Sequence, residues 1–119
     1  MKRRLVIFQV PSPGPVFSCF VIGELSIHTS LEEQLRDFSA ISVAHPIRCL
    51  EVATAQGSTS MYLPYPFLSG ETVVSFNLAG LITSPLELKE QMQPAIFEAY
   101  DKVLAEMRAA KAGIQLVKN

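Results

Sequence analysis

Four side chains are of the types that bind transition metals: Cys19, His28, His45 and Cys49. A structural zinc site needs four thiolate or imidazole ligands, usually arranged as two close pairs. Cys19 and His28 are nine positions apart, and His45 and Cys49 are four positions apart. On an extended strand the second pair would be separated by about 13 Å, too far to share one ion. We therefore expect no metal site and no cofactor.

Nucleophilic catalysis needs a thiol or hydroxyl beside a base. Cys49 with either histidine could form such a pair in the folded chain, but no local signature accompanies it. The sequence contains no GxSxG, Walker or GxGxxG motif. Cys19 and Cys49 also lie outside a CxxC motif, so we expect two free, buried thiols and no catalytic residue.

Glu24 is a carboxylate at the end of an otherwise apolar segment, on the same side as Phe20 and Ile22 if that segment is a strand. A carboxylate in apolar surroundings is a candidate for binding or for acid–base chemistry. One hypothesis is therefore a small-molecule binding module or a small enzyme. Its polar groups would be Glu24, His28 and His45, in a cleft between the sheet and the C-terminal helix.

The segment YLPYPFL, residues 62–68, combines large apolar side chains with two prolines. Proline cannot donate a hydrogen bond to the interior of a sheet, which predicts an edge strand or an extended loop. Aromatic side chains on a segment stiffened by proline offer a large contact area at low entropic cost. We expect part of this run to cover the core, and Tyr62, Tyr65 and Phe67 to form a binding surface for a second copy of the chain.

The chain has 119 residues and a net charge of −1, from 10 basic and 11 acidic residues. The length predicts a single domain over residues 1–119, and the charge balance argues against a nucleic-acid partner. Only 18% of the residues are charged, against a typical value of about 25%, which favours self-association. Lys2, Arg3 and Arg4 precede an apolar run that is shorter than the ~7–15 apolar residues of a secretion signal. No segment reaches the ~18–20 apolar residues of a membrane span. We expect a cytoplasmic protein without a membrane partner.

Apolar alternation and turn signals predict mainly strands in the first two thirds of the chain. Gly23 indicates a bulge or a close backbone approach within the second strand. Ile47 to Ala55 also has features of a helix, but we choose a strand because Gln56-Gly57-Ser58 then makes a hairpin turn. The expected strands are residues 3–10, 16–28, 47–55, 59–63 and 72–82.

Two patterns are typical of helix starts. Ser30 and Glu33 can form a capping box, which predicts a short helix near residues 30–38. Ser84-Pro85-Leu86-Glu87 combines a serine cap with a proline at the first helical position, which predicts a long helix running toward Ala112. Pro94 falls inside that second span, so we expect the helix to be kinked there.

Together these elements predict an α+β fold, with an antiparallel sheet of four or five strands, a short helix, and a long, kinked C-terminal helix packed on one face. The function favoured is a non-enzymatic interaction or assembly protein that self-associates, as a dimer or larger oligomer, through apolar surface near residues 62–68. An unidentified protein partner is the alternative to a second copy. Alanine at Tyr62, Tyr65 and Phe67 together is then expected to shift the sizing-column profile toward monomer.

Overall fold

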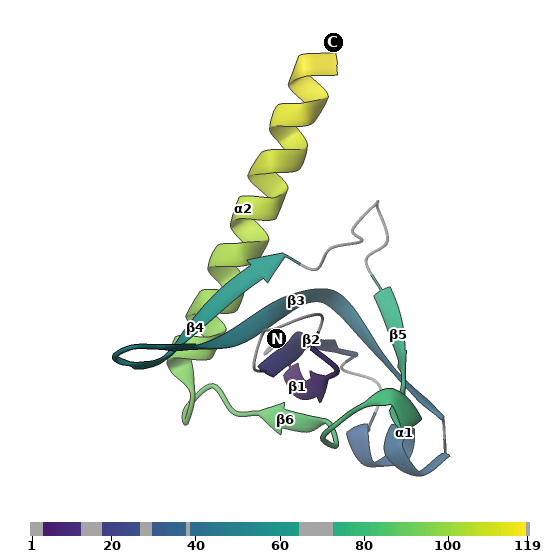
Figure 1. Cartoon of the computed structure of the whole chain (residues 1–119). Helices are drawn as coiled ribbons and strands as arrows, with labels where there is room; N and C mark the ends of the chain where they lie inside the picture. The colour runs from purple at the N-terminus through teal and green to yellow at the C-terminus, as the bar shows by residue number, and fades with distance from the viewer. Residues whose placement is uncertain (1–3, 13–17, 27–29, 38, 65–72, 119) are drawn as a thin grey trace.

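The computed structural model describes residues 4–12, 18–26, 30–37, 39–64 and 73–118, and it shows an α+β fold (Figure 1). The strands are β1 (Arg4–Val10), β2 (Ser18–Leu25), β3 (Ala40–Thr54), β4 (Gly57–Pro64), β5 (Val73–Asn77) and β6 (Leu86–Leu88). The helices are α1 (Leu31–Asp37), the 3-10 turn η1 (Leu78–Gly80) and α2 (Pro94–Lys118). The predicted fold class is confirmed, with a sheet of six strands where four or five were expected.

The strands form one antiparallel sheet in the order β4-β3-β2-β1-β6, and β5 pairs with the first part of β3. One edge of β3 pairs with β2, while the other pairs with β5 over residues 40–44 and with β4 over residues 47–54. A two-residue turn joins β3 to β4 and is followed by Gly57 at a φ of 126°. The choice of a strand for residues 47–55 is confirmed, except that Ala55 belongs to this turn.

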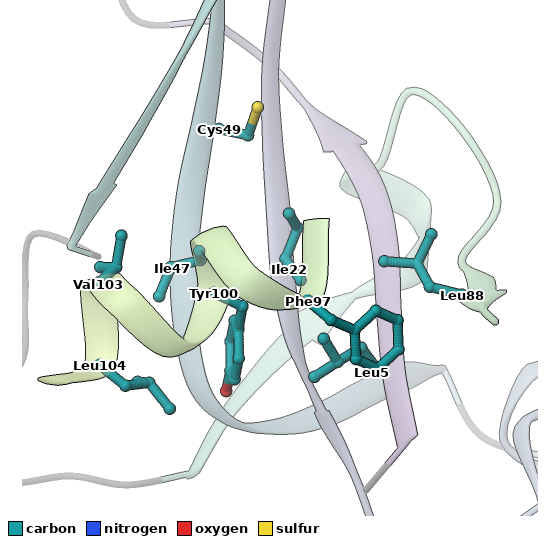
Figure 2. Packing of buried hydrophobic residues seen from close by; sticks show 9 residues of the cluster. All are labelled: Leu5, Ile22, Ile47, Cys49, Leu88, Phe97, Tyr100, Val103 and Leu104. Carbon is teal, nitrogen blue, oxygen red and sulfur yellow. The ribbon is translucent and has the colours of Figure 1, made fainter. Parts of the chain in front are cut away.

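Apolar side chains cover both faces of the sheet. The helix-side cluster, shown in Figure 2, consists of Leu5, Ile22, Ile47, Cys49, Leu88, Phe97, Tyr100, Val103 and Leu104. The opposite cluster consists of Val6, Phe8, Val21, Leu25, Ile41 and Val43, with Leu31 of α1 and Phe76 of β5 packed against it. β2 contributes to both clusters, so it is a central strand that is covered on both sides.

The start of α2 differs from the sequence prediction. α2 begins at Pro94, where a proline is well tolerated because the amide it lacks would have no partner inside the helix. Leu86–Leu88 instead form β6, which pairs with residues 5–7 of β1. The predicted helix start at Ser84 and the kink at Pro94 are therefore wrong.

Among its described side chains, those by which α2 packs on the helix-side cluster lie between Ile96 and Met107. The remainder of the helix extends beyond the sheet in Figure 1. Over the part of the chain that the structure describes, neither helix has an apolar stretch of the length that crossing a bilayer takes.

The strand predicted over residues 72–82 is correct only in its first part. β5 ends at Asn77, whose side-chain oxygen accepts a hydrogen bond from the amide of Ala79 at 3.0 Å. This cap starts the turn η1, so the strand cannot continue. Ile82, at the end of the predicted strand, consequently lies outside the sheet and is 57% exposed.

Arg4 and Glu87 connect β1 to β6 at one edge of the sheet. Arg4 Nη2 lies 2.7 Å from Glu87 Oε1, and Arg4 Nε lies 3.1 Å from Glu87 Oε2. The hydrogen bonds from the guanidinium hold the pKa of Glu87 below its usual value. A carboxyl group whose pKa is lower in the folded chain stabilises the fold at pH values above its unfolded pKa, and this contribution is lost as the pH falls through the folded pKa.

We expect Glu87→Gln to lower the free energy of unfolding at pH 7 by at most about 1 kcal/mol, because both side chains are partly exposed and solvent screens the pair. In strongly acidic buffer, where Glu87 is protonated, the variant and the wild type should be equally stable. Urea unfolding at the two pH values measures this, with the exposed Glu98→Gln as the control. An equal loss at both pH values would show that the charge of Glu87 has no role.

Candidate functional site

The centre of the candidate site is a bulge between β2 and β3. The pairing of these strands shifts by one residue around Gly23, so that two β3 residues, His45 and Pro46, lie opposite one β2 residue. His45 has a φ of +48°, in the left-handed region that residues with a Cβ seldom adopt. Bulges re-aim side chains and are frequent beside functional sites. The predicted bulge or close approach at Gly23 is confirmed.

Glycine is needed at position 23 because the side chain of Val43 on β3 lies close to the backbone of β2 there. A Cβ atom at position 23 would lie 2.7 Å from Cβ and 2.8 Å from Cγ2 of Val43. Any side chain at this position would therefore push β3 away from β2 and change the position of His45.

His45 and Glu24 form a hydrogen-bonded pair beside the bulge. His45 Nδ1 lies 2.8 Å from Glu24 Oε2, and the two side chains are 40% and 27% exposed. The carboxylate accepts the Nδ1 proton, which fixes the orientation of the ring and leaves Nε2 as the nitrogen that can meet another molecule.

Tyr100 of α2 supports the same bulge from inside the core. Its hydroxyl donates to the backbone oxygen of His45 at 2.7 Å and lies 3.3 Å from Glu24 Oε2. The side chain is fully buried, and Figure 2 shows it projecting from α2 between Phe97 and Leu104. The left-handed backbone of His45 is thus fixed by contacts to both the main chain and the side chain.

A hollow of about 660 Å³ opens beside the His45–Glu24 pair. Among the described residues, pairing between β2 and β3 ends at Glu24, and residues 40–43 of β3 pair with β5 alone. The hollow occupies this separation, and it is lined by the end of β2, the start of β3, Gln34 of α1 and Val73 of β5. Its size falls within the about 300–1,000 Å³ of small-molecule sites.

Gln34 closes one side of the hollow and is only 7% exposed. It is held in place by α1, where Ser30 Oγ accepts a hydrogen bond from the amide of Glu33 at 3.4 Å. This contact and the helix over residues 31–37 confirm the predicted short helix. The Gln34 side-chain oxygen accepts a hydrogen bond from the amide of Ser42 at 3.3 Å.

Comparison with known protein families, with curated proteins and with solved structures finds no match for this chain. Its candidate site therefore rests on the geometry alone.

Two of the three polar residues of the small-molecule hypothesis, Glu24 and His45, are brought together by the structure, while His28 lies outside the described residues. The hollow is not where that hypothesis placed it. No described residue of α2 lines it, and Pro94 starts the helix instead of opening a cleft within it.

Of the predicted binding residues 62, 65 and 67, only Tyr62 is described. Tyr62 is half-buried, packs against the helix-side cluster and lies opposite Cys49 in the β3–β4 pairing. Tyr65 and Phe67 lie outside the described residues, so the structure does not place the rest of that surface.

Both cysteines are free and buried, as predicted. Burial raises the pKa of the Cys19 thiol. Burial also raises the pKa of the Cys49 thiol, and this effect is larger than the lowering by hydrogen bonds from Tyr62 and Ser60. A raised pKa keeps the thiols in their less reactive protonated form. Among the described residues, no three His, Cys, Asp or Glu side chains gather closely enough to hold a metal ion.

The sequence analysis missed Gln34 and the hydroxyl of Tyr100. Gln34 lies three residues after Leu31, at a helical spacing that puts it on the apolar face of α1. A polar residue at such a position is a usable signal. The Tyr100 ring is an ordinary core side chain for a helix, and nothing in the sequence indicates the backbone oxygen to which its hydroxyl donates.

Proposed function

We propose that this protein is a small-molecule binding module whose ligand occupies the hollow beside His45. The observation that carries the proposal is the His45–Glu24 pair at the wall of a hollow large enough for a ligand. The second imidazole nitrogen of His45, Nε2, would supply a directional polar contact, and Ala40, Ala44 and Val73 would supply apolar surface. A mostly apolar pocket with a few fixed polar groups is typical of small-molecule sites.

The backbone of His45 supports this proposal. A left-handed conformation costs a residue with a Cβ about 1–2 kcal/mol, which glycine would avoid. His45 nevertheless occupies this position, and its contacts to Glu24 and Tyr100 hold it there. Strained residues held in place by their surroundings are concentrated at functional sites.

The proposal is tested with indole, phenol and cyclohexanol, each an apolar molecule with one hydrogen-bond donor for His45 Nε2. NMR titration of the isotope-labelled chain should show shifts of the backbone signals of residues 40–45. His45→Asn should weaken binding several-fold while keeping the fold, because asparagine tolerates the left-handed region. Met61→Ala, on the exposed part of β4, is the matched control and should bind like the wild type.

Two results would contradict the proposal. Either none of the three probes shifts the signals of residues 40–45 at millimolar concentration, or His45→Asn binds the probes as tightly as the wild type does.

A second candidate function is self-association along β4, through the surface near residues 62–68. The supporting observation is that β4 is an edge strand without a charged residue, and that its Met61 is 47% exposed. Uncharged edge strands are open to pairing with another chain. The triple alanine variant at Tyr62, Tyr65 and Phe67 tests this candidate, and elution of that variant at the wild-type volume as a folded oligomer would contradict it. The buried free thiols fit a cytoplasmic location, which stays a proposal.

A further inference from the structure

We infer that the ligand of this hollow is an uncharged molecule with a carbonyl oxygen, such as an amide or a lactam, which accepts a hydrogen bond from the side-chain amide of Gln34. This inference rests on the proposed function and adds the chemical class of the ligand. It follows from an unused buried donor, from the pairing of β3 and from the charges around the hollow.

Gln34 carries a buried donor group for which the described residues provide no partner. The residue is 7% exposed, and its side-chain oxygen is taken by the amide of Ser42. The side-chain nitrogen is therefore on the other branch of the amide and carries two protons. This nitrogen donates no hydrogen bond to any of the described residues. A buried polar group left in this way is uncommon in folded proteins and calls for a physical explanation.

The pairing of β3 explains why a glutamine side chain is present at all. Ser42 lies opposite Ser75 of β5, and their hydroxyls are 2.8 Å apart. The Ser42 amide points the other way, toward the side from which β2 has already separated, and it meets the oxygen of Gln34. Gln34 thus takes the place of a neighbouring strand for this backbone amide, and it is one of the residues that line the hollow.

The unused donor restricts what can bind. A ligand that fills the hollow without offering an acceptor would leave the Gln34 nitrogen buried and unsatisfied, which weakens binding. A carbonyl oxygen is a strong acceptor and satisfies it. A ligand that also carries an N–H or O–H group can donate to His45 Nε2.

The charges around the hollow favour an uncharged ligand. No lysine or arginine is among its described lining residues, whereas the carboxylate of Glu24 is. An anion would therefore lose its hydration without gaining a lysine or arginine among the described lining residues, and it would lie near the carboxylate of Glu24. An amide or lactam carbonyl offers the acceptor without this cost.

The experiment compares benzamide with benzoate. The two molecules have the same ring, but benzamide carries an uncharged amide and benzoate carries a charged carboxylate. NMR titration of the full chain should give a dissociation constant for benzamide of about 1 mM, as expected for a ligand this small, and weaker binding of benzoate. Gln34→Met keeps the length of the side chain and removes its donor together with the oxygen that accepts from Ser42, and it should weaken benzamide binding about tenfold. Phenol, which offers Gln34 only a weak acceptor, should bind this variant within a factor of about two of the wild type.

Gln93→Met is the matched control. The Gln93 side-chain oxygen also accepts from a backbone amide, that of Lys89 at 3.4 Å, but Gln93 lies outside the hollow. Its variant should bind benzamide like the wild type. If phenol binds but Gln34→Met leaves benzamide binding unchanged, or if benzoate binds more tightly than benzamide, the carbonyl class is wrong while the binding function stands. If neither phenol nor benzamide binds, the proposed function itself is overturned.

Discussion

Tyr100→Ala is expected to lower the free energy of unfolding by about 3–5 kcal/mol, the range observed when a large aromatic side chain is removed from a core. Tyr100 is fully buried and lies in the middle of the helix-side cluster, where it joins α2 to the sheet. The loss has two parts: a cavity where the ring was, and a backbone oxygen at His45 without its donor. Urea unfolding followed by circular dichroism measures the total.

Tyr100→Phe separates these two parts because it keeps the ring and removes only the hydroxyl. It should cost about 0.5–1.5 kcal/mol, the usual net value of one hydrogen bond. It should also weaken phenol binding, since His45 loses the contact that fixes its backbone. Glu98→Ala, an exposed change on the same helix, should stay within about 0.5 kcal/mol of the wild type. If Tyr100→Phe were as stable as the wild type and bound phenol equally well, the hydroxyl would have no part in holding the bulge.

Gly23→Ala is expected to lower the free energy of unfolding by about 1–3 kcal/mol, as overpacking in a core usually does. The new methyl group would lie within 2.8 Å of two Val43 side-chain atoms, a separation that forces the strands apart. Because the displaced residues form the bulge, the backbone NMR signals of His45 and its neighbours should shift most.

Gly80→Ala is the matched control for this change. A Cβ atom at Gly80 would have nothing within 4 Å, so the same substitution should alter stability by no more than about 0.5 kcal/mol. Equal effects of the two substitutions would show that the close approach of Gly23 to Val43 has no energetic weight.

The strands of the first half could be predicted because their apolar patterns and the turn residues that end them are both local in the sequence. β1, β2 and the β3–β4 hairpin follow from β-branched and aromatic runs that end at turn residues. The start of α2 could not, because Ser84-Pro85 has the local chemistry of a helix cap. Pairing of Leu86–Leu88 with β1 overrides that signal, and this pairing depends on residues about eighty positions away.

The candidate site was only partly predictable, for the same reason. Glu24 and His45 could be named as polar candidates, and Gly23 could be named as a point of close approach. That the bulge places His45 directly beside Glu24 depends on the register between two strands, which a single sequence does not specify. Gln34 needed both the helix face and the end of the β2–β3 pairing to be known.

The position of α2 has a consequence for how the chain folds as it is made. The β1–β2 hairpin pairs within the first 25 residues, yet the side chains that cover its helix-side face are near positions 97–104. Until the ribosome has released them, Leu5, Ile22 and Ile47 stay in contact with water or with other chains. Contacts between such distant positions form slowly and expose apolar surface in the meantime. A nascent chain halted before α2 would therefore expose this face to chaperones. We expect a chain without its last quarter to aggregate, whether or not its hollow can still bind a ligand.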